Sequence, residues 1–421
     1  MQVIELFKTL CAIPHCSYKT DAMRTYLEKL MLEHGYRVEV DSAGNVFGSV
    51  EGTAITLQSH YDMVCIGDAP ELELYEDEGW LHAKNSTLGA DNGIGMAMML
   101  ALMQEGIKVD LLFTSDEEVG LLGARGLDVK LKTPCLLNLD SEEEGVVTIG
   151  CAGGVDIIAT LPIMTTEKDS FLFEVEASGY PGGHSGIDID KDIPNAIKVL
   201  ASQLASVPEI KMVSFEGGQR RNAIAKSASA LITSECDYID LDSAVCQGRQ
   251  KCVVINESDK LIEMLDGFEH GVRAFNDDFG IVDTSINLAQ VMMHNDEVTI
   301  HLSARSMHCD ALKQVEAETV AYFEAYGCDV VSEGFYPPWK PDKTPFSSLI
   351  LDYVARHADR ASLGAIHAGL ECGIIKERYP DIDMASIGPN IIYPHSTREA
   401  VEIASVERVF DTLKEIVISV E

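Results

Sequence analysis

Apolar residues in the first third of the chain alternate between helical and strand spacing. Residues 3–12 and 20–34 carry apolar side chains at helical spacing, which predicts two amphipathic helices. Residues 38–50 predict a hairpin, and a helix rich in Met and Leu begins near Asn92. Short apolar runs predict three strands, at residues 54–59, 109–114 and 136–139. Strands separated by helices indicate an α/β layer with a mostly parallel sheet.

The middle third has the pattern of an antiparallel sheet. Helical spacing predicts two helices, at residues 195–206 and 258–275. Apolar runs predict four strands, at residues 171–177, 228–234, 280–290 and 298–304. This mixture of strands and helices indicates an α+β domain.

The last part of the chain returns to helical spacing. Residues 336–341 are irregular and rich in proline, as at a domain crossing, and helices are predicted at residues 346–357 and 405–418. We therefore predict a discontinuous α/β domain formed by residues 1–155 and 336–421. An α+β domain, residues 156–335, is inserted into it.

Charge and hydropathy exclude several classes of function. The 32 basic and 68 acidic residues give a formal net charge of 32 − 68 = −36. This charge repels nucleic-acid phosphates and anionic lipid, so we expect neither as a partner. The hydrophobic fraction of 46% argues against disorder. The longest apolar run, residues 96–103, is far shorter than the ~20 residues of a membrane span.

The cysteines and the amino-terminal residues predict a cytoplasmic protein. The eleven cysteines are scattered and include no Cys-x-x-Cys pair, which is typical of reduced thiols and not of a disulfide framework or a zinc knuckle. The first residues carry charges where a signal peptide needs an apolar core.

Histidine and acidic residues gather at or near the ends of the predicted strands. The segments are Gln58-Ser59-His60-Tyr61-Asp62, Gly89-Ala90-Asp91-Asn92-Gly93, Ser115-Asp116-Glu117-Glu118 and Asn138-Leu139-Asp140-Ser141. Carboxyl ends of parallel strands meet at one edge of a sheet, so the four segments are expected to lie together. Buried carboxylates need a compensating cation, and histidine with carboxylates is a zinc-type ligand set. Taken singly, each segment is more typical of a helix N-cap, for which Asp91 and Asp116 are suited.

Two neighbouring pairs carry further chemistry. One of Glu117 and Glu118 can bind a metal while the other acts as general base on a water. In His60-x-Asp62 the carboxylate can hold one ring nitrogen so that the other faces a metal. Gly183-His184-Ser185-Gly186 lacks the spacing of a serine nucleophile elbow, and no phosphate-binding P-loop occurs. Gly93-Ile94-Gly95 is interpreted as helix–strand packing.

These segments together resemble the M20 metallopeptidases. The resemblance is carried by His60-x-Asp62, Gly89-Ala90-Asp91-Asn92-Gly93, Asp116-Glu117-Glu118-x-Gly120, Asn138-x-Asp140-Ser141-Glu142-Glu143, Gly182-Gly183-His184-Ser185-Gly186 and Pro394-His395-Ser396. The segments Cys151-Ala152-Gly153-Gly154, Arg221-Asn222-Ala223-Ile224 and His367-Ala368-Gly369-Leu370-Glu371-Cys372-Gly373 resemble the aminoacyl-histidine dipeptidase branch, which cleaves carnosine. The matching segments follow one another along nearly the whole chain.

The resemblance implies a zinc-peptidase-like catalytic domain that holds two divalent metal ions, most readily zinc, with cobalt or manganese as alternatives. His60 and Asp140 would bind one metal, Glu118 and His395 the other, and Asp91 would bridge them. Asp62 would orient His60. Glu117 would take a proton from the attacking water and deliver it to the leaving amine.

The inserted domain would act as a lid and carry the dimer interface. By resemblance, His184 would donate a hydrogen bond to the oxyanion, often across a dimer, and Arg305 would pair with the substrate carboxylate. Asn222 would assist at the same carbonyl. For Arg305 the alternative is a surface charge at a strand end, and for Asn222 a loop cap. Glu371 is equally consistent with an amine-binding residue and with a structural ion pair.

We therefore predict a cytoplasmic, homodimeric metallo-dipeptidase. Its substrates would be dipeptides or small peptides with a free amino terminus, which the family associates with an aspartate at the position of Asp140. Histidine as the second residue of the substrate is a further expectation. The alternatives are a tripeptide aminopeptidase or N-acyl amino acid amidohydrolase on the same scaffold, and a non-catalytic peptide-binding protein.

Overall fold

The computed structural model describes residues 2–294 and 296–420, which form two compact units. Unit 1 consists of residues 1–151, 339–365 and 370–421, and unit 2 of residues 152–338 and 366–369, each taken within the described residues. These bounds lie a few residues from the boundaries expected from the sequence. The return of residues 366–369 to unit 2 was not predicted.

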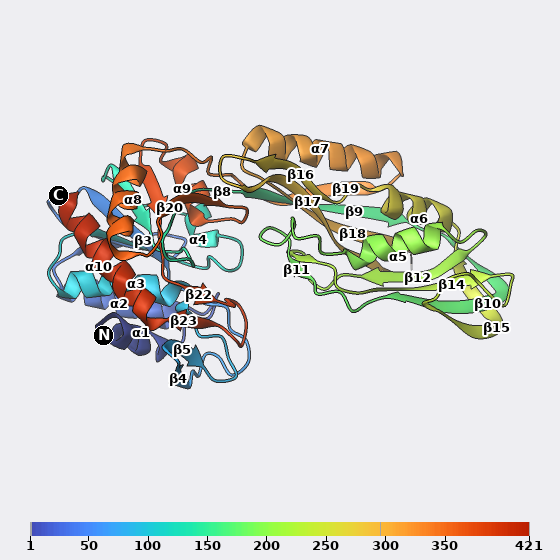
Figure 1. The fold of residues 1–421 in the computed structure, drawn as a ribbon, viewed down its shortest axis with the longest axis horizontal. Helices are drawn as coiled ribbons and strands as arrows, with labels where there is room; N and C mark the ends of the chain where they lie inside the picture. The colour runs from blue at the N-terminus through green and yellow to red at the C-terminus, as the bar shows by residue number, and fades with distance from the viewer. Residues whose placement is uncertain (1, 295, 421) are drawn as a thin grey trace. The chain divides into compact units, whose positions relative to one another are not determined.

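Unit 1 is built on a sheet of eight strands in the order β1-β2-β6-β3-β7-β21-β8-β20, of which β3, β8 and β20 are labelled in Figure 1. Its strands are β1 (Arg37–Val40), β2 (Val46–Ser49), β3 (Ile55–His60), β6 (Asp110–Thr114), β7 (Cys135–Asn138), β8 (Val146–Cys151), β20 (Ser362–Ile366) and β21 (Asp383–Ser386). The central strands β6, β3, β7 and β21 run parallel. In contrast, β1 pairs antiparallel with β2, β2 with β6, and β8 with β21. A smaller sheet contains β4 (Leu74–Asp77), β5 (Trp80–Ala83), β22 (Ile391–Ile392) and β23 (Ala400–Glu402).

The helices of unit 1 bury apolar faces against this sheet and against each other. They are α1 (Gln2–Cys11), α2 (Asp21–Glu33), α3 (Ala90–Gln104), α4 (Leu122–Arg125), α8 (Pro345–His357), α9 (Glu371–Arg378) and α10 (Ile403–Ser419). The helix α3 packs on β3 and on α1, and α10 contacts α8, α1 and α3. Nearly every side chain of α3 between Ala90 and Met103 is buried, which accounts for its continuous run of Met and Leu.

Gly95 allows α3 to approach the ends of β3 and β7 closely. A Cβ atom at Gly95 would lie 2.8 Å from the carbonyl oxygen of Leu139 and 3.0 Å from Oγ of Ser59. Both distances are too short for a side chain, so only glycine fits there. The predicted helix–strand packing is found at Gly95, whereas Gly93 serves helix–helix packing, because a Cβ atom there would lie 2.7 Å from the ring of Phe7 in α1.

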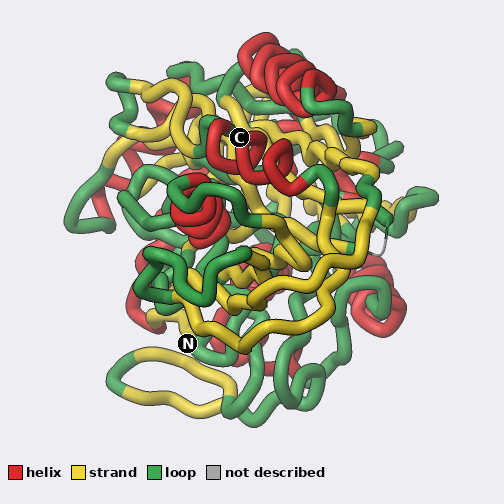
Figure 2. The backbone as a smooth tube through the Cα atoms, turned by 90° about the vertical axis from the view of Figure 1, so that its right-hand side faces the viewer, coloured by secondary structure: helices red, strands yellow, loops and turns green. Residues whose placement is uncertain are grey.

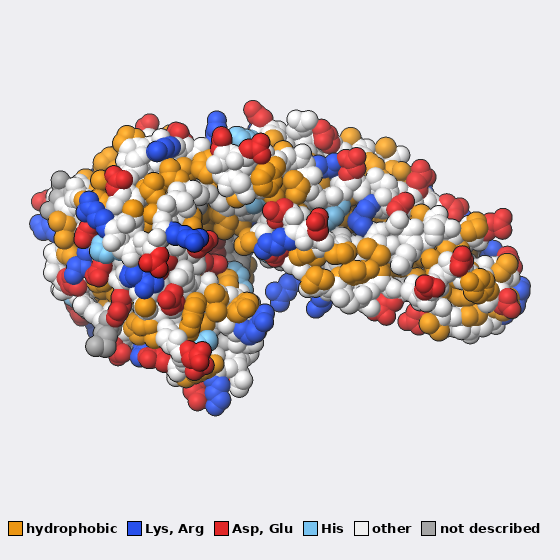
Figure 3. Space-filling view, viewed as in Figure 1, with side chains coloured by type: hydrophobic (Ala, Val, Ile, Leu, Met, Phe, Trp, Pro, Cys, Tyr) orange, Lys and Arg blue, Asp and Glu red, His pale blue; other side chains and the backbone are white. Residues whose placement is uncertain are grey.

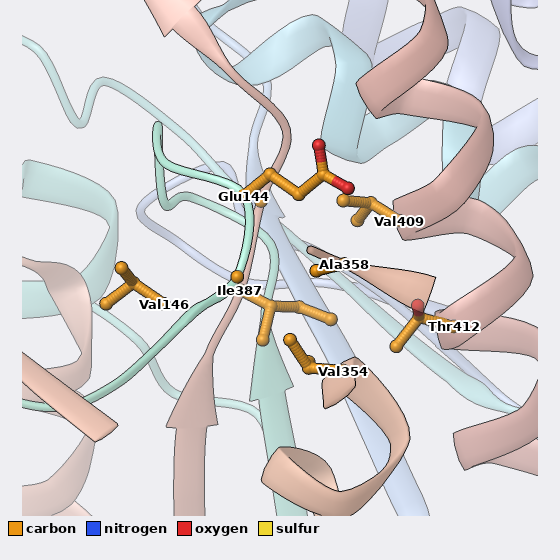
Figure 4. Close-up of a pocket in the computed structure, with 9 residues that line it drawn as sticks. Glu144, Val146, Val354, Ala358, Ile387, Val409 and Thr412 are labelled. Carbon is orange, nitrogen blue, oxygen red and sulfur yellow. The ribbon is translucent and has the colours of Figure 1, made fainter. Parts of the chain in front are cut away.

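Part of unit 1 forms an apolar contact among two helices and a connecting segment. Figure 4 shows Val354 of α8 and Val409 and Thr412 of α10 lining one pocket together with Ile387. Glu144 lies at the same pocket, and Arg408 donates two hydrogen bonds of 2.6 Å to its carboxylate. The residues that line this pocket include none of the predicted catalytic, metal-binding or substrate-binding residues.

Unit 2 contains a sheet in the order β15-β10-β14-β12-β17-β18-β9-β19, with β16 paired to β17; these strands are labelled in Figure 1. Figure 2 shows the strands of the molecule in yellow and the helices in red. All of its described pairings are antiparallel. The strands are β9 (Gly153–Pro162), β10 (Thr165–Ala177), β12 (Lys211–Gly217), β14 (Ala228–Ser234), β15 (Ala244–Ile255), β16 (Gly271–Asn276), β17 (Ile281–Met293), β18 (Glu297–Ser306) and β19 (Asp329–Tyr336). Two short strands, β11 (Gly183–His184) and β13 (Ala223–Ile224), pair separately.

Three helices cover the apolar side of this sheet. They are α5 (Ala196–Ala205), α6 (Ser258–Gly267) and α7 (Cys309–Ala325). The helix α5 contacts β10, β14 and α6, and α7 contacts β9, β18 and β19. Their buried side chains form one hydrophobic core with the inner faces of the strands.

The predicted helix at residues 258–275 is wrong in its second half. The helix α6 ends at Gly267, and Phe268 is extended. Gly271 has φ of +110°, which L-amino acids rarely adopt, and residues 271–276 then pair with β17 as strand β16. The exposed side chains of Val272 and Phe275 gave an apolar spacing that did not reflect a buried helix face.

Acidic side chains are spread over the face of the molecule seen in Figure 3, where basic side chains lie among them. This agrees with the strongly negative formal charge of the sequence. None of the helices within residues 2–294 and 296–420 is long and apolar enough to cross a membrane.

The expectation that all cysteines are reduced is corrected by a disulfide between Cys16 and Cys65. Backbone hydrogen bonds from Ser17 to Met63 (N to O, 3.2 Å) and from Met63 to His15 (N to O, 3.1 Å) align the two segments. This alignment places the Cα atoms of Cys16 and Cys65 5.6 Å apart, within disulfide range. Sequence alone could not show it because the two cysteines are 49 residues apart.

We expect thiol labelling under denaturing conditions to distinguish the disulfide. Of the eleven cysteines, nine are free, so an alkylating reagent should add nine labels before reduction and eleven after it. The closed loop spans 49 residues, so Cys16→Ser should lower the free energy of unfolding by about 4 kcal/mol in the chain-entropy account. Cys236→Ser, at an exposed free cysteine, is the matched control. Eleven labels without reduction would contradict the disulfide.

Candidate metal centre

The register of the parallel strands brings the predicted site residues to one edge of the sheet of unit 1. His60, the last residue of β3, pairs with Thr114 at the end of β6, and Gln58 pairs with Asn138 at the end of β7. Residues that follow these strands therefore leave the sheet side by side. The site residues gathered there are called the carboxylate–histidine cluster: His60, Asp62, Asp91, Glu117, Glu118, Asp140 and His395.

Asp91 lies at the centre of the cluster, between the two histidines. Its Oδ1 is 3.1 Å from Nε2 of His60, and its Oδ2 is 3.1 Å from Nε2 of His395. Nε2 of His60 is also 3.4 Å from Oδ1 of Asp140. On the other side, Nε2 of His395 is 2.9 Å from Oε2 of Glu118. One carboxylate therefore serves two neighbouring groups of ligand atoms.

These distances define two groups that share Asp91. The first contains His60, Asp91 and Asp140, and the second contains Asp91, Glu118 and His395. Within each group the possible ligand atoms lie within 4.8 Å of one another. Histidine nitrogens with carboxylate oxygens are donors suited to zinc, and also to cobalt or manganese. The structure brings His60 near Asp140 and Glu118 near His395, as expected, and a further group of possible ligand atoms joins His60 with Glu117 and Glu118. The assignment of ligands to each metal stays a prediction.

The N-cap interpretation of Asp91 and Asp116 does not describe these residues. The N-cap position of α3 is Gly89, and no side chain caps it from that position. Asp91 has φ of −82° and ψ of 105°, outside the helical region, and its peptide bond to Asn92 is cis. Oδ1 of Asp116 instead accepts a hydrogen bond of 2.6 Å from the backbone N–H of Tyr18.

Asp62 connects the two sides of the cluster. Nδ1 of His60 donates to the backbone carbonyl of Asp62 at 3.0 Å and lies 3.4 Å from its carboxylate. The same carboxylate accepts hydrogen bonds from the backbone N–H groups of Glu117 (2.9 Å) and Glu118 (3.3 Å) and from the hydroxyl of Ser17 (2.8 Å). These contacts favour the tautomer of His60 that carries its proton on Nδ1, and they leave the unprotonated Nε2 facing Asp91.

Burial and charge crowding shape the protonation of the cluster. Burial, together with the nearby charge of Asp91, raises the pKa of Glu118 to about 7. Burial and the charge of Glu118 raise the pKa of Glu117 well above its usual value. Burial alone would lower the pKa of His395, but its hydrogen bonds to Asp91 and Glu118 raise it to about 11. Each carboxylate therefore favours a positive neighbour.

A second, independent observation supports a bound cation at the cluster. Oε1 of Glu118 is buried and has no hydrogen-bond partner among the described residues. A buried, unpartnered carboxylate oxygen costs free energy unless a cation faces it. Divalent metals would also displace the protons that the two histidines hold, because only the unprotonated nitrogens bind metal.

Glu371 is buried behind the cluster and pairs with neutral groups. Its Oε2 accepts hydrogen bonds of 2.6 Å from Nε2 of Gln58 and from Oγ1 of Thr114. Its Oε1 is buried and has no partner among the described residues. Of the two expectations for Glu371, a structural ion pair is not what the structure shows. Burial raises the pKa of Glu371 to about 7.

Glu371→Gln should change how stability depends on pH in the metal-free protein. The folded chain holds a proton on Glu371 up to about pH 7, whereas an unfolded glutamate loses it near 4.5. The stability contributed by the protonated acid is therefore complete below about pH 4.5 and is lost as the pH rises through 7, by up to about 3 kcal/mol. A neutral glutamine does not lose it.

Urea unfolding of the metal-free wild type and variant between pH 4.5 and 8 measures this effect. The variant should gain stability relative to the wild type as the pH rises, and the two should differ least at the acidic end. A difference that stays constant over this range would contradict the assignment of a buried, proton-holding Glu371.

The three predicted substrate-binding residues belong to unit 2. Arg305 is 8% exposed, and its Nη1 donates to the hydroxyl of Tyr336 at 3.0 Å. Its Nε has no hydrogen-bond partner among the described residues. The alternative of a surface charge at a strand end is therefore wrong for Arg305, because this guanidinium is buried in β18. The structure leaves its predicted contact with a substrate carboxylate untested.

His184 and Asn222 lie on neighbouring segments of unit 2. Nδ1 of His184 accepts hydrogen bonds of 3.2 Å from the backbone N–H groups of Gly186 and Ile187. The neutral ring therefore carries its proton on Nε2, which makes that nitrogen a donor. The backbone carbonyl of Asn222 accepts a hydrogen bond from Ser185, and the Asn222 side chain is exposed. The predicted roles of both residues stay predictions.

Glu399 and Asn92 are, with Ser17, residues that contact the cluster and were not predicted. The carboxylate of Glu399 accepts hydrogen bonds from backbone N–H groups at residues 88–91, and Asn92 donates to the carbonyl of Leu139 at 2.8 Å and to Asp140. Asn92 lies beside Asp91 in the sequence, and this position could have indicated that Asn92 belongs to the site. Nothing in the sequence distinguishes Glu399 from the many other acidic residues.

Comparison with known proteins identifies the class of this fold and site. The profile of peptidase family M20/M25/M40 matches residues 56–419. The chain therefore belongs to this peptidase family. The predictions of the family, of the fold class and of an enzyme that hydrolyses peptide bonds are confirmed.

Individual relatives match over almost their whole length. A cytosol non-specific dipeptidase of Escherichia coli is 33% identical, over 98% of this chain and 96% of that protein. The crystal structure of an aminoacylhistidine dipeptidase from Vibrio alginolyticus is 31% identical, with a TM-score of 0.81 over 100% of this chain and 96% of the other. A tripeptidase structure from Staphylococcus aureus, 17% identical with a TM-score of 0.63, covers 100% of this chain and 98% of its own and shows the shared fold.

Proposed function

We propose that this M20 peptidase hydrolyses the peptide bond of dipeptides with a free amino terminus at the carboxylate–histidine cluster, with two divalent metal ions. The observation that carries the proposal is the pair of ligand groups that share Asp91, with Glu117 beside them. The Escherichia coli and Vibrio relatives described above are both named as dipeptidases, which supports the substrate class. A preference for histidine as the second residue is supported by the resemblance of the sequence to the aminoacyl-histidine dipeptidase branch and by the name of the Vibrio protein.

His60, Asp91 and Asp140 would hold one ion, and Asp91, Glu118 and His395 the other. When bound, the two ions would polarise the scissile carbonyl and favour ionisation of the attacking water. Zinc fits the donor set, although cobalt and manganese accept the same ligands.

Glu117 is the residue proposed to move protons. Its carboxylate would accept a proton from the attacking water and pass it to the nitrogen of the leaving amine. Burial and the neighbouring Glu118 raise its pKa, which brings proton uptake closer to neutral pH. The hydrogen bond from its backbone N–H to Asp62 fixes the peptide from which the side chain extends.

The residues of unit 2 would act on the substrate. Nε2 of His184 would donate to the oxyanion, and Asn222 would assist at the same oxygen. The guanidinium of Arg305 would pair with the free carboxylate of the dipeptide, since a buried guanidinium with an available Nε–H suits a planar anion. Assigning unit 1 to metal binding and unit 2 to substrate contact and dimer formation belongs to the same proposal.

A cytoplasmic location and a homodimer complete the proposal. The location is supported by the Escherichia coli relative, which is named as a cytosol dipeptidase. For the homodimer through unit 2, the supporting feature is β19, the outermost strand of its sheet, which pairs on one side with β9 and is largely exposed. An edge strand of this kind can pair with a second chain.

The substrate class is tested by assaying four compounds side by side: β-Ala-His, Leu-Leu, a tripeptide and an N-acetyl amino acid. We expect hydrolysis of the dipeptides, abolished by chelation and restored by zinc, because chelation removes the ions that the cluster would hold. A faster rate for β-Ala-His than for Leu-Leu would support the histidine preference. Hydrolysis of the N-acetyl amino acid alone would overturn the requirement for a free amino terminus.

Glu117→Gln should separate catalysis from metal binding. The amide keeps the shape of the side chain but cannot accept the water proton, so kcat should fall by about 10²- to 10⁴-fold while the bound metal stays at two per chain. Metal content by atomic emission and steady-state kinetics measure the two effects. The control is Glu105→Gln, which removes a carboxylate paired with Lys414 at the far end of α3. Full turnover in Glu117→Gln would refute the assigned proton transfer.

A further inference from the structure

Glu399 is a buried carboxylate that accepts four backbone hydrogen bonds. Its Oε2 accepts from the N–H groups of Leu88 (2.8 Å) and Gly89 (3.2 Å), and its Oε1 from those of Ala90 (2.8 Å) and Asp91 (3.4 Å). The residue is 3% exposed. Each carboxylate oxygen therefore holds a pair of consecutive peptide groups.

These four peptide groups form the backbone that presents Asp91. The first N–H groups of a helix have no partner within the helix, and the N-cap residue Gly89 has no side chain to supply one. Asp91 itself has non-helical backbone angles in this segment. Glu399 thus holds an irregular turn in the conformation that places both oxygens of Asp91 between His60 and His395.

The same residue is anchored close to His395 in the chain. His395 has a positive φ of 55° in the turn between β22 and β23, and the N–H of Glu399 donates to the carbonyl of Ser396 at 3.1 Å. Directly after Glu399, Ala400 begins β23 and pairs with His82 of β5. Glu399 therefore joins two segments, one carrying Asp91 and the other carrying His395, which are 304 residues apart.

We propose that Glu399 is a positioning residue that sets the geometry between Asp91 and His395 and thereby the affinity of the second ligand group. The inference rests on the proposed function only in that the cluster binds two metal ions. Glu399 faces backbone N–H groups and is not placed as a ligand. Its action is through the peptide groups that hold Asp91 and through the turn that holds His395.

The two ligand groups should respond unequally to loss of this contact. The second group, Asp91, Glu118 and His395, contains two ligands whose segments Glu399 joins. The first group, His60, Asp91 and Asp140, contains one, and its other two ligands leave the ends of the sheet strands. A helix cap with a purely structural role would lower the stability of the fold and leave both metal affinities unchanged.

Glu399→Gln tests the proposal on the full chain. One oxygen becomes an NH₂ group, which cannot accept from the backbone N–H groups that face it, so one of the two pairs loses its partner. We expect one zinc ion to bind with nearly wild-type affinity and the other about ten- to a hundredfold more weakly, by chelator competition. Titration with Co²⁺, followed by visible absorption, should show the same weaker binding of one of the two ions. For dipeptide hydrolysis, kcat should fall more than KM changes.

The control is Glu144→Gln, a substitution of the same kind at another largely buried carboxylate of unit 1. Glu144 forms its bonds with Arg408 and contacts no residue of the cluster in the described pairs. It should lower the unfolding temperature of the metal-free protein and leave both metal affinities as in the wild type. His395→Ala serves as the reference for a lost second group.

Wild-type affinity for both ions in Glu399→Gln would overturn the proposal, whatever the activity. If Glu399→Gln does not fold, the same titrations on Glu399→Asp decide, because aspartate keeps the charge but is one methylene too short to hold both pairs. Two wild-type affinities there would equally overturn it. A wild-type chain that binds two ions but cleaves no dipeptide would refute the proposed function and leave the result on Glu399 intact.

Discussion

The site depends on keeping several carboxylates close together away from water. Asp62, Asp91, Glu117, Glu118 and Asp140 lie around two histidines, and burial disfavours the charged form of each acid. The protein contributes only part of the compensation, through His60, His395 and backbone N–H groups. Divalent cations, as proposed above, would complete the balance, and this requirement would tie the location of the site to the strand ends that converge there.

Backbone N–H groups take a large part in this compensation. The carboxylate of Asp62 accepts from Glu117 and Glu118, and the carboxylate of Glu399 accepts from four peptide groups at the start of α3. In both cases hydrogen bonds from backbone N–H groups stabilise a buried carboxylate. The backbone segment that donates these bonds also carries a proposed metal ligand or the proposed base. The carboxylates of Asp62 and Glu399 therefore help to hold the backbone of the site residues in place.

Much of unit 1 and of the cluster was accessible from the sequence because the relevant signals are local. Each of β3, β6 and β7 begins with apolar residues; His60 is the last residue of β3, and Glu118 and Asp140 follow β6 and β7 within a few residues. Parallel strands align such residues without further information. His395 had no such signal and was placed only through the resemblance to the family, because it lies in a turn far along the chain.

Features that depend on contacts between distant segments could not be predicted in the same way. The disulfide of Cys16 and Cys65 requires the alignment of two loops, and the contact of Glu399 with Leu88 spans 311 residues. At residues 271–276 an apolar spacing typical of a helix is overridden by pairing with β17.

The second group of ligands also has a consequence for synthesis on the ribosome. The ribosome makes His60, Asp91, Glu118 and Asp140 before unit 2 and His395 after it. The proposed second ion would therefore be bound only after the whole inserted unit has been synthesised.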